Sequence, residues 1–184
     1  QIIKKKKLVF KNQVYKAYSN YIKSKHYIIK DYLTLEVVGK RFGGVCCIVS
    51  NKKKIGLMKV YSPILNQYLY SLVQGFCDKN ETSSIAIKRE IFEETGVKVD
   101  KKNIKYLNKI LPMHSLVKSK LAIYFAHLKT LDSSDFKLRQ KELGTGKIYF
   151  FNLKQIKKML KKPHTFDLIS YAAISYFLII KKTL

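Results

Sequence analysis

Apolar and polar positions alternate through the middle of the chain in short runs that are typical of β-strands. These runs begin after residue 32, are rich in β-branched and aromatic residues, and are separated by polar turn residues. They predict strands over residues 33–38, 44–50, 55–61, 68–73, 104–111, 121–128 and 147–152. An Asn-Lys-Lys-Lys turn separates the second and third of these strands, which together predict a β-hairpin.

Three other segments have the spacing of helices. One follows the Thr-Ser-Ser sequence at residues 82–84, whose hydroxyls can cap a helix, and it ends at Gly96, a residue suited to a left-handed C-terminal cap. Residues 75–81 are expected to form the loop that leads into this helix. Two more helices are predicted over residues 153–161 and 167–180. Strands mixed with a few helices predict an α/β (α+β) fold.

The beginning of the chain differs in composition from the rest. Residues 1–60 contain 15 Lys and Arg but two acidic residues, and no Pro or Gly interrupts residues 1–38. We therefore expect residues 1–32 to be a basic N-terminal extension. Residues 33–184 are expected to form one domain, because a chain of 184 residues is long enough for one sizeable core.

The whole chain is strongly basic, since 37 Lys and Arg against 12 Asp and Glu give a formal net charge of +25. Such a charge attracts phosphates, nucleic acid or anionic lipid. No apolar run reaches the roughly 18–20 residues that a membrane span needs, so no span is expected. The three Cys have neither a disulfide framework nor a metal-binding spacing, which favours a reducing intracellular compartment, cytoplasmic or mitochondrial/organellar.

Acidic residues are concentrated in residues 75–96, where five acids outweigh three bases. On the predicted helix, Glu90, Glu93 and Glu94 stand at i, i+3 and i+4 and share one face, where unpaired carboxylates repel each other. Such a cluster of hard oxygen ligands suits Mg²⁺ or Mn²⁺. The adjacent Arg89 can hold a carboxylate through a bidentate pair. The pattern predicts a divalent-metal site on this helix.

The spacing in this segment resembles the Nudix box, the motif of the Nudix hydrolases, without a departure. The matching residues are Gly75, Glu81, Arg89, Glu90, Ile91, Glu93, Glu94, Gly96 and Val97. Over about residues 35–180 the chain is also similar to the ADP-ribose and ADP-sugar pyrophosphatase branch, in the order of its strands and in Pro112. Ser62 and Ser71 depart from that branch, which usually has an Arg and a Glu there.

The resemblance implies a fold, an activity and a set of site residues. The fold would be an α/β/α sandwich with a mixed β-sheet. The activity would be metal-dependent hydrolysis of the diphosphate in a nucleoside diphosphate derivative of the ADP-ribose or ADP-sugar type. Glu90, Glu93, Glu94 and the carbonyl of Gln74 would hold Mg²⁺ or Mn²⁺. Glu93, Glu94 and Arg89 would also act in catalysis, with Arg89 orienting a carboxylate.

Residues outside the box are candidates for the remaining roles. Glu142 lies in a basic loop where the resembling branch often keeps a catalytic Glu, so it is a candidate general base. A carboxylate of the box is the alternative base. Arg41, Tyr61 and His114 are candidate substrate-binding residues: the Tyr ring could stack on a base and the His could contact a phosphate.

A second hypothesis comes from the charge. Outside residues 75–96 the chain carries a net +27, more than one diphosphate requires. The chain could therefore be a non-catalytic subunit of a large RNA-containing assembly, such as an organellar ribosome. The intact Glu cluster argues against this hypothesis, because a protein freed from catalysis has no physical reason to keep mutually repelling carboxylates. RNA association and a homodimer remain expectations beside the enzymatic one.

Overall fold

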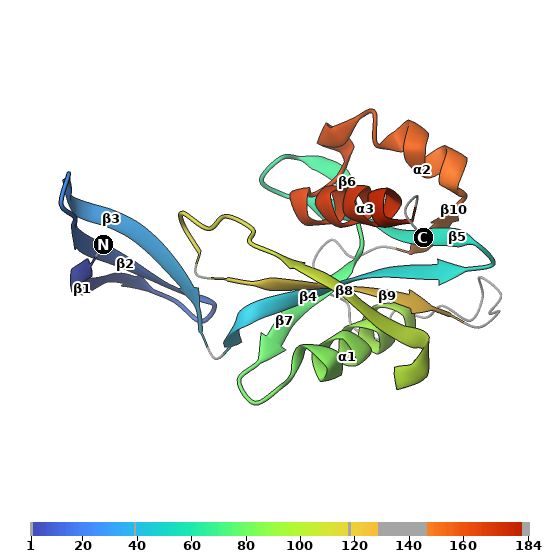
Figure 1. Cartoon of the computed structure of the whole chain (residues 1–184), viewed down its shortest axis with the longest axis horizontal. Helices are drawn as coiled ribbons and strands as arrows, with labels where there is room; N and C mark the ends of the chain where they lie inside the picture. Colours follow the sequence, from blue (N-terminus) through green and yellow to red (C-terminus); the bar gives the residue numbers. More distant parts are fainter. Residues whose placement is uncertain (1, 39, 118, 129–146, 182–184) are drawn as a thin grey trace.

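The computed structural model describes residues 2–38, 40–117, 119–128 and 147–181, which form a small N-terminal sheet and a larger sheet packed between helices (Figure 1). The strands are β1 (Ile2–Lys11), β2 (Tyr15–Lys23), β3 (Ile28–Val37), β4 (Lys40–Asn51), β5 (Lys54–Ser62), β6 (Gln67–Ser71), β7 (Val73–Asp78), β8 (Ile104–Ile110), β9 (Leu121–His127) and β10 (Ile148–Phe151). The helices are α1 (Ser83–Thr95), α2 (Leu153–Met159) and α3 (Leu168–Ile180). No helix in this described part of the chain is long and apolar enough to cross a membrane.

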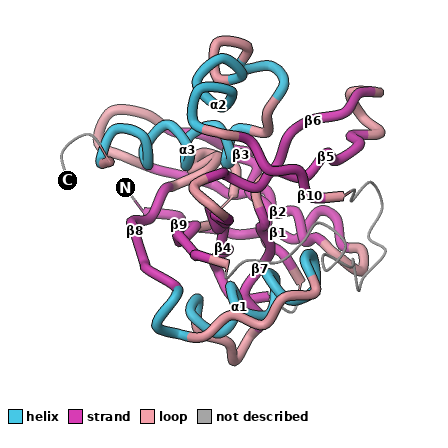
Figure 2. The backbone as a smooth tube through the Cα atoms, turned by 90° about the vertical axis from the view of Figure 1, so that its right-hand side faces the viewer, coloured by secondary structure: helices cyan, strands magenta, loops and turns pink. Residues whose placement is uncertain are grey.

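The larger sheet is mixed. Its strands follow the order β10-β5-β4-β9-β8, while β6 pairs with β5 and β7 pairs with β4. The β4–β9 pair is parallel and the other pairs are antiparallel. Helix α1 covers one face of this sheet, and α2 and α3 cover the other (Figures 1 and 2). The predicted α/β/α sandwich with a mixed sheet is confirmed.

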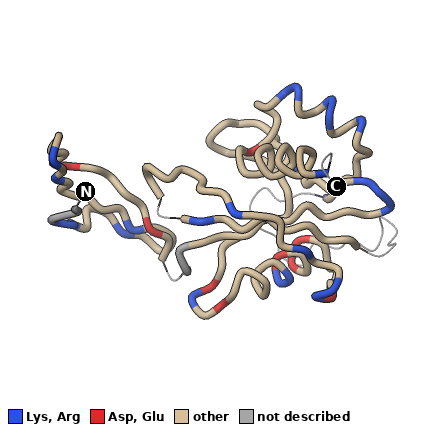
Figure 3. Tube along the Cα trace, in the orientation of Figure 1, with Lys and Arg blue, Asp and Glu red and all other residues tan. Residues whose placement is uncertain are grey.

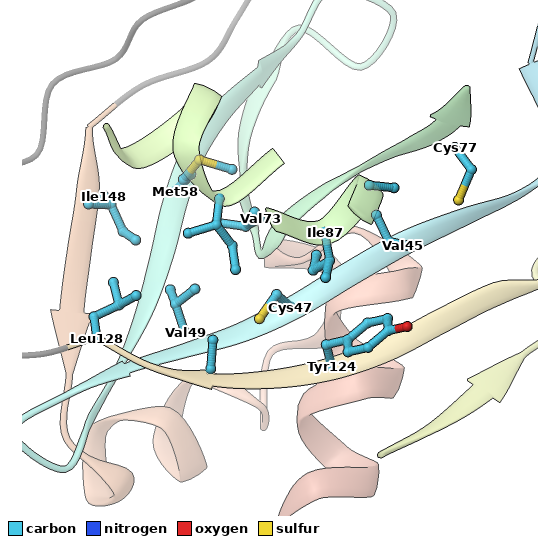
Figure 4. Close-up of a cluster of buried hydrophobic side chains, with 13 residues drawn as sticks. Val45, Cys47, Val49, Met58, Val73, Cys77, Ile87, Tyr124, Leu128 and Ile148 are labelled. Carbon is cyan, nitrogen blue, oxygen red and sulfur yellow. The ribbon is translucent and has the colours of Figure 1, made fainter. Parts of the chain in front are cut away.

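Strand β4 is the centre of this sandwich, and its side chains supply both cores. Successive side chains of a strand point to opposite faces, so an apolar run can be buried on both sides. Val45, Cys47 and Val49 point toward α1 and join one buried cluster (Figure 4). Cys46 and Ile48 point the other way and join a second cluster beneath α2 and α3.

The N-terminal sheet has the antiparallel order β1-β2-β3. The buried amide of Asn20 ties its strands together, donating to the carbonyl of Tyr32 and to the Thr34 hydroxyl, both at 2.8 Å. The backbone N–H of Leu35 donates to the carbonyl of Leu116 at 2.8 Å, which joins this sheet to the loop between β8 and β9. The N-terminal sheet is thus hydrogen-bonded to the β8–β9 loop of the larger sheet.

Strands β1 and β2 are not predicted from the sequence, and residue 32, where the basic extension is expected to end, lies inside β3. The described side chains of β1 are exposed and many are Lys, so this strand has no alternating apolar pattern to mark it. Pairing with β2 alone keeps β1 extended. β1 could therefore be predicted only from its pairing with β2.

Two predictions near the box are wrong in detail. Residues 75–81 are predicted as a loop, but β7 continues through Gly75 to Asp78 because Gly75 pairs with Val45 of β4. The strand predicted over residues 68–73 is split at Leu72, since the N–H of Leu72 donates to the hydroxyl of Ser170 on α3 at 2.8 Å. Both differences come from contacts distant in sequence.

Candidate active site

Helix α1 carries the acidic residues of the site, and its two ends are fixed as the sequence predicts. The Thr82 hydroxyl accepts from the N–H of Ile85 at 3.3 Å and caps the N-terminus. Gly96 adopts a left-handed φ of 74°, and its N–H donates to the carbonyl of Phe92 at 2.8 Å. These caps set the length and the phase of the helix, and hence the face on which its carboxylates lie.

Glu90 lies against strand β7 at Gly75. Its side chain is buried, with 8% of the residue exposed. A Cβ atom on residue 75 would stand 2.1 Å from Oε1 of Glu90 and 2.2 Å from its carboxyl carbon, well inside any real contact. Gly75 has an ordinary negative φ, so the requirement for glycine is one of space and not of backbone conformation. Gly75 and Glu90 together place a carboxylate directly on β7.

Arg89 joins the carboxylates of the box. Its Nη1 donates to Glu90 Oε1 at 2.7 Å and to Glu93 Oε2 at 2.9 Å. On its other side, Nε and Nη2 donate to the two carboxylate oxygens of Glu81, at 3.1 and 2.9 Å. Nη2 also donates to the carbonyl of Phe76 on β7 at 2.9 Å. One guanidinium therefore holds the helix, the preceding loop and the strand in register.

The ionisation of this group follows from its contacts. The hydrogen bonds from Arg89 lower the pKa of Glu81, assisted by the N–H of Asp78, which donates to the same carboxylate at 3.0 Å. Reciprocally, the hydrogen bonds to Glu81 and the charge of Glu90 raise the pKa of Arg89. The site therefore keeps a permanent cation that offsets the repulsion between its carboxylates.

Glu94 reaches the strand one residue before Gly75. The N–H of Gln74 donates to Glu94 Oε2 at 3.3 Å, and the Gln74 side chain donates to the Ser71 hydroxyl at 3.0 Å. Glu90, Glu94 and the Gln74 backbone thus meet at one point of β7. Within the described residues, no three His, Cys, Asp or Glu side chains are close enough to hold a metal ion together. The donor set is nevertheless one of hard oxygens, and Arg89 uses one oxygen each of Glu90 and Glu93.

A cavity of about 430 Å³ opens beside these residues. Its lining includes Gln74, Gly75 and Phe76 of β7 on one side, and Tyr15 and Val37 of the N-terminal sheet on the other. The remaining lining comes from the β8–β9 loop, the start of β9, α3 and β4, and consists of Pro112, Met113, Val117, Ser119, Leu121, Ile169 and Gly44. Tyr15 and Val37 were missed by sequence reasoning, because no local signal connects them to the box.

The candidate substrate-binding residues are not brought together. Tyr61 lies on the β5–β6 hairpin, where its hydroxyl donates to Asn66 at 2.6 Å and its ring packs on Tyr68, and it does not line the cavity. His114 is exposed on the β8–β9 loop, next to the cavity but outside its lining. Arg41 is on β4, and its side chain is outside the described part of the structure, as is the whole of Glu142.

Comparison with known proteins adds to this geometry. A family model of the NUDIX domain matches residues 40–170. Among solved structures, the chain is similar to a crystal structure described as that of an ADP compounds hydrolase, with a TM-score of 0.77 and 16% sequence identity. The alignment covers 99% of this chain and 94% of that chain, and at this identity it shows a shared fold. No curated protein matches the chain.

Proposed function

The chain belongs to the Nudix family of hydrolases, and we propose that it is a divalent-metal-dependent diphosphatase acting on a nucleoside diphosphate derivative of the ADP-ribose or ADP-sugar type. The observation that carries the proposal is that Glu90 and Glu93 converge on Arg89 while Glu94 contacts the Gln74 backbone on the adjacent strand, at the edge of a cavity large enough for a nucleoside. The ADP compounds hydrolase of the same fold supports the substrate class.

Glu90, Glu93, Glu94 and the carbonyl of Gln74 would hold the Mg²⁺ or Mn²⁺. When bound, such a cation neutralises diphosphate charge and lowers the pKa of a coordinated water. Arg89 prepares the site by holding two of these carboxylates on one guanidinium, so that a cation competes with it for their oxygens. Gly75 leaves the space in which the Glu90 carboxylate sits.

The reaction adds water across the diphosphate, so that one phosphorus gains a hydroxyl and the other leaves as a phosphate monoester. A general base must take the proton from that water. We assign this role to Glu142, with Glu93 or Glu94 as the alternative. The position of Glu142 lies outside the described residues, so kinetics must decide between them.

The cavity suits the nucleoside end of the substrate. Its volume of about 430 Å³ falls in the range of roughly 300–1,000 Å³ that is usual for small-molecule sites. Its lining is mainly apolar and includes the rings of Tyr15 and Phe76 but none of the charged residue types. A base can stack on such rings, while the diphosphate reaches outward to the carboxylates of α1.

An assay of product release tests this proposal. The protein is incubated with Mg²⁺ or Mn²⁺ and a panel of ADP-ribose, ADP-sugars and matched compounds with other bases, and the nucleoside monophosphate released from each is quantified. We expect AMP from the ADP compounds, no AMP after chelation with EDTA, and a turnover lowered by at least about 10²-fold in Glu93→Gln. Absence of turnover with every compound and both metals would overturn the proposal.

A homodimer and a reducing compartment belong to the same proposal. The N-terminal sheet exposes apolar side chains, among them Val9, Phe10 and Ile28, each more than half exposed, which a second copy could cover. Light scattering during gel filtration would measure the mass. The three Cys are buried and form no disulfide, and burial raises the pKa of Cys46 to about 12, which keeps that thiol neutral and unreactive.

A further inference from the structure

A second cavity lies away from the Nudix box, on the face of the large sheet that α2 and α3 cover. Its volume is about 210 Å³, and it shares no lining residue with the cavity beside the box. It opens between the β4–β5 turn, the end of β9, the start of α2 and the end of α3. The residues that line it are Ser50, Lys53, Ile55, Phe125, His127, Leu153, Phe177 and Lys181.

The lining combines aromatic rings with cations. Phe125 and Phe177 stack with centroids 5.2 Å apart and planes within 9°. The ammonium of Lys181 lies over the Phe177 ring, 5.9 Å from its centroid, and Lys53 and His127 complete the rim. No Asp or Glu belongs to the lining, so the cavity favours an anionic ligand with a flat apolar part. Its size, below the range of drug-sized pockets, suits one ring system.

Ser50 places a polar side chain in this cavity. The residue is only 7% exposed and lies near the end of β4. Ile48, two residues earlier on β4, faces α2 and α3, so Ser50 points to the same side, where the cavity lies. A hydroxyl both donates and accepts hydrogen bonds, so it can pair with the polar edge of a ring.

The β4–β5 turn, which contains Lys53, has a backbone conformation that is unusual for lysine. Lys52 and Lys53 have φ values of 46° and 63°, both in the left-handed region. Two-residue hairpin turns of this kind favour Asn and Gly, because a Cβ is disfavoured there. The chain keeps two Lys at these positions, and Lys53 is the one that reaches the cavity.

Positive charge continues outside the cavity, over a longer stretch than one phosphate group occupies. Helix α2, whose first residue Leu153 lines the cavity, exposes Lys154, Lys157 and Lys158 (Figure 3). The apolar side of α2 is turned inward, with Ile156 fully buried, so the outward side of this helix is polar and basic. The arrangement matches a chain of phosphates in water.

We propose that this cavity is a nucleotide-binding site separate from the active site, which takes one base of a single-stranded RNA. The base enters between Phe177, Leu153 and Ile55, and its polar edge pairs with the Ser50 hydroxyl. Lys53 and Lys181 contact the adjoining phosphate. The neighbouring phosphates of the RNA lie along α2.

Two turn variants form a matched pair that tests the site. Lys53→Gly and Lys52→Gly each remove one positive charge and each relax the same strained turn, but Lys53 alone lines the cavity. Binding of a fluorescein-labelled ten-nucleotide RNA is measured by anisotropy in EDTA, over a series of salt concentrations. We expect Lys53→Gly to weaken binding by about fivefold or more at low salt and to reduce the salt slope by about 0.7, the loss of one phosphate contact. Lys52→Gly should change affinity by less than about twofold.

Competition with unlabelled AMP distinguishes a site for free nucleotides from a site for a nucleotide within an RNA strand. If AMP competes with the labelled RNA and Lys53→Gly weakens that competition, the site also takes free nucleotides. If only unlabelled RNA competes, the site takes a nucleotide within an RNA strand. Equal effects of the two turn variants, or none from either, would overturn the proposal, because the binding would then be diffuse attraction to Lys. Lys53→Gly should hydrolyse the best diphosphate substrate at the wild-type rate, which separates this site from the catalytic one.

Discussion

Gly75→Ala introduces one methyl group at the point where Glu90 meets β7. The nearest carboxylate oxygen must move from 2.1 Å to at least 3.0 Å from the new Cβ, a shift of at least 0.9 Å. That carboxylate is buried and held by Arg89 at 2.7 Å, so it cannot move without breaking this bond or displacing α1. Overpacking of this kind costs about 1–3 kcal/mol of unfolding free energy.

The expected effects follow from that displacement. At about 2–4 °C per kcal/mol for a chain of this length, the Tm should fall by roughly 2–12 °C. A misplacement near 1 Å at a catalytic group lowers kcat by about 10²-fold. Thermal unfolding followed by circular dichroism gives the first quantity, and AMP release with Mg²⁺ gives the second.

A double-mutant cycle isolates the cause. Glu90→Ala removes the carboxylate that the new methyl group meets, so Gly75→Ala should cost much less stability in that background than in the wild type. The double variant should regain part of the lost Tm while remaining inactive. Equal costs in the two backgrounds, or a Gly75→Ala protein with wild-type Tm and kcat, would refute the steric argument.

Three further predictions concern the charged groups of the site. Glu93→Gln and Glu94→Gln should each lower kcat by at least about 10²-fold with an unchanged circular dichroism spectrum, and wild-type turnover in both would reject the site. Glu142→Gln should lower kcat while KM stays similar, as expected for a group that acts in the transition state, and an unchanged kcat at every pH would return the role of base to Glu93 or Glu94. The lowered pKa of Glu81 means that its bond to Arg89 stabilises the fold above the unfolded pKa of about 4.3 and is lost as pH falls through the folded value. Urea unfolding between about pH 3 and pH 6 should therefore show a smaller acid-induced loss of stability in Glu81→Gln than in the wild type, and identical losses would contradict the pairing.

The box helix shows how much local sequence determines. Thr82 and Gly96 terminate α1 where the sequence predicts, because helix caps depend on hydrogen bonds within one turn. The i, i+3 and i+4 spacing then places the three Glu on one side. The mixture of strands and helices predicts an α/β class, and the resemblance to the Nudix box implies the sandwich. These features need only neighbours within a few residues.

Contacts between distant segments decided the rest. Gly75 is predicted to begin a loop but lies in β7, because β4 pairs with it and Glu90 needs the space above it. Tyr15 reaches the cavity through the N-terminal sheet, whose strands β1 and β2 are not predicted from the sequence. Ser50 and Phe177 meet only when α3 packs on the large sheet. The sequence by itself determined the chemistry of the box, whereas strand pairing and helix packing decided which residues surround it, since those contacts join positions that no local pattern connects.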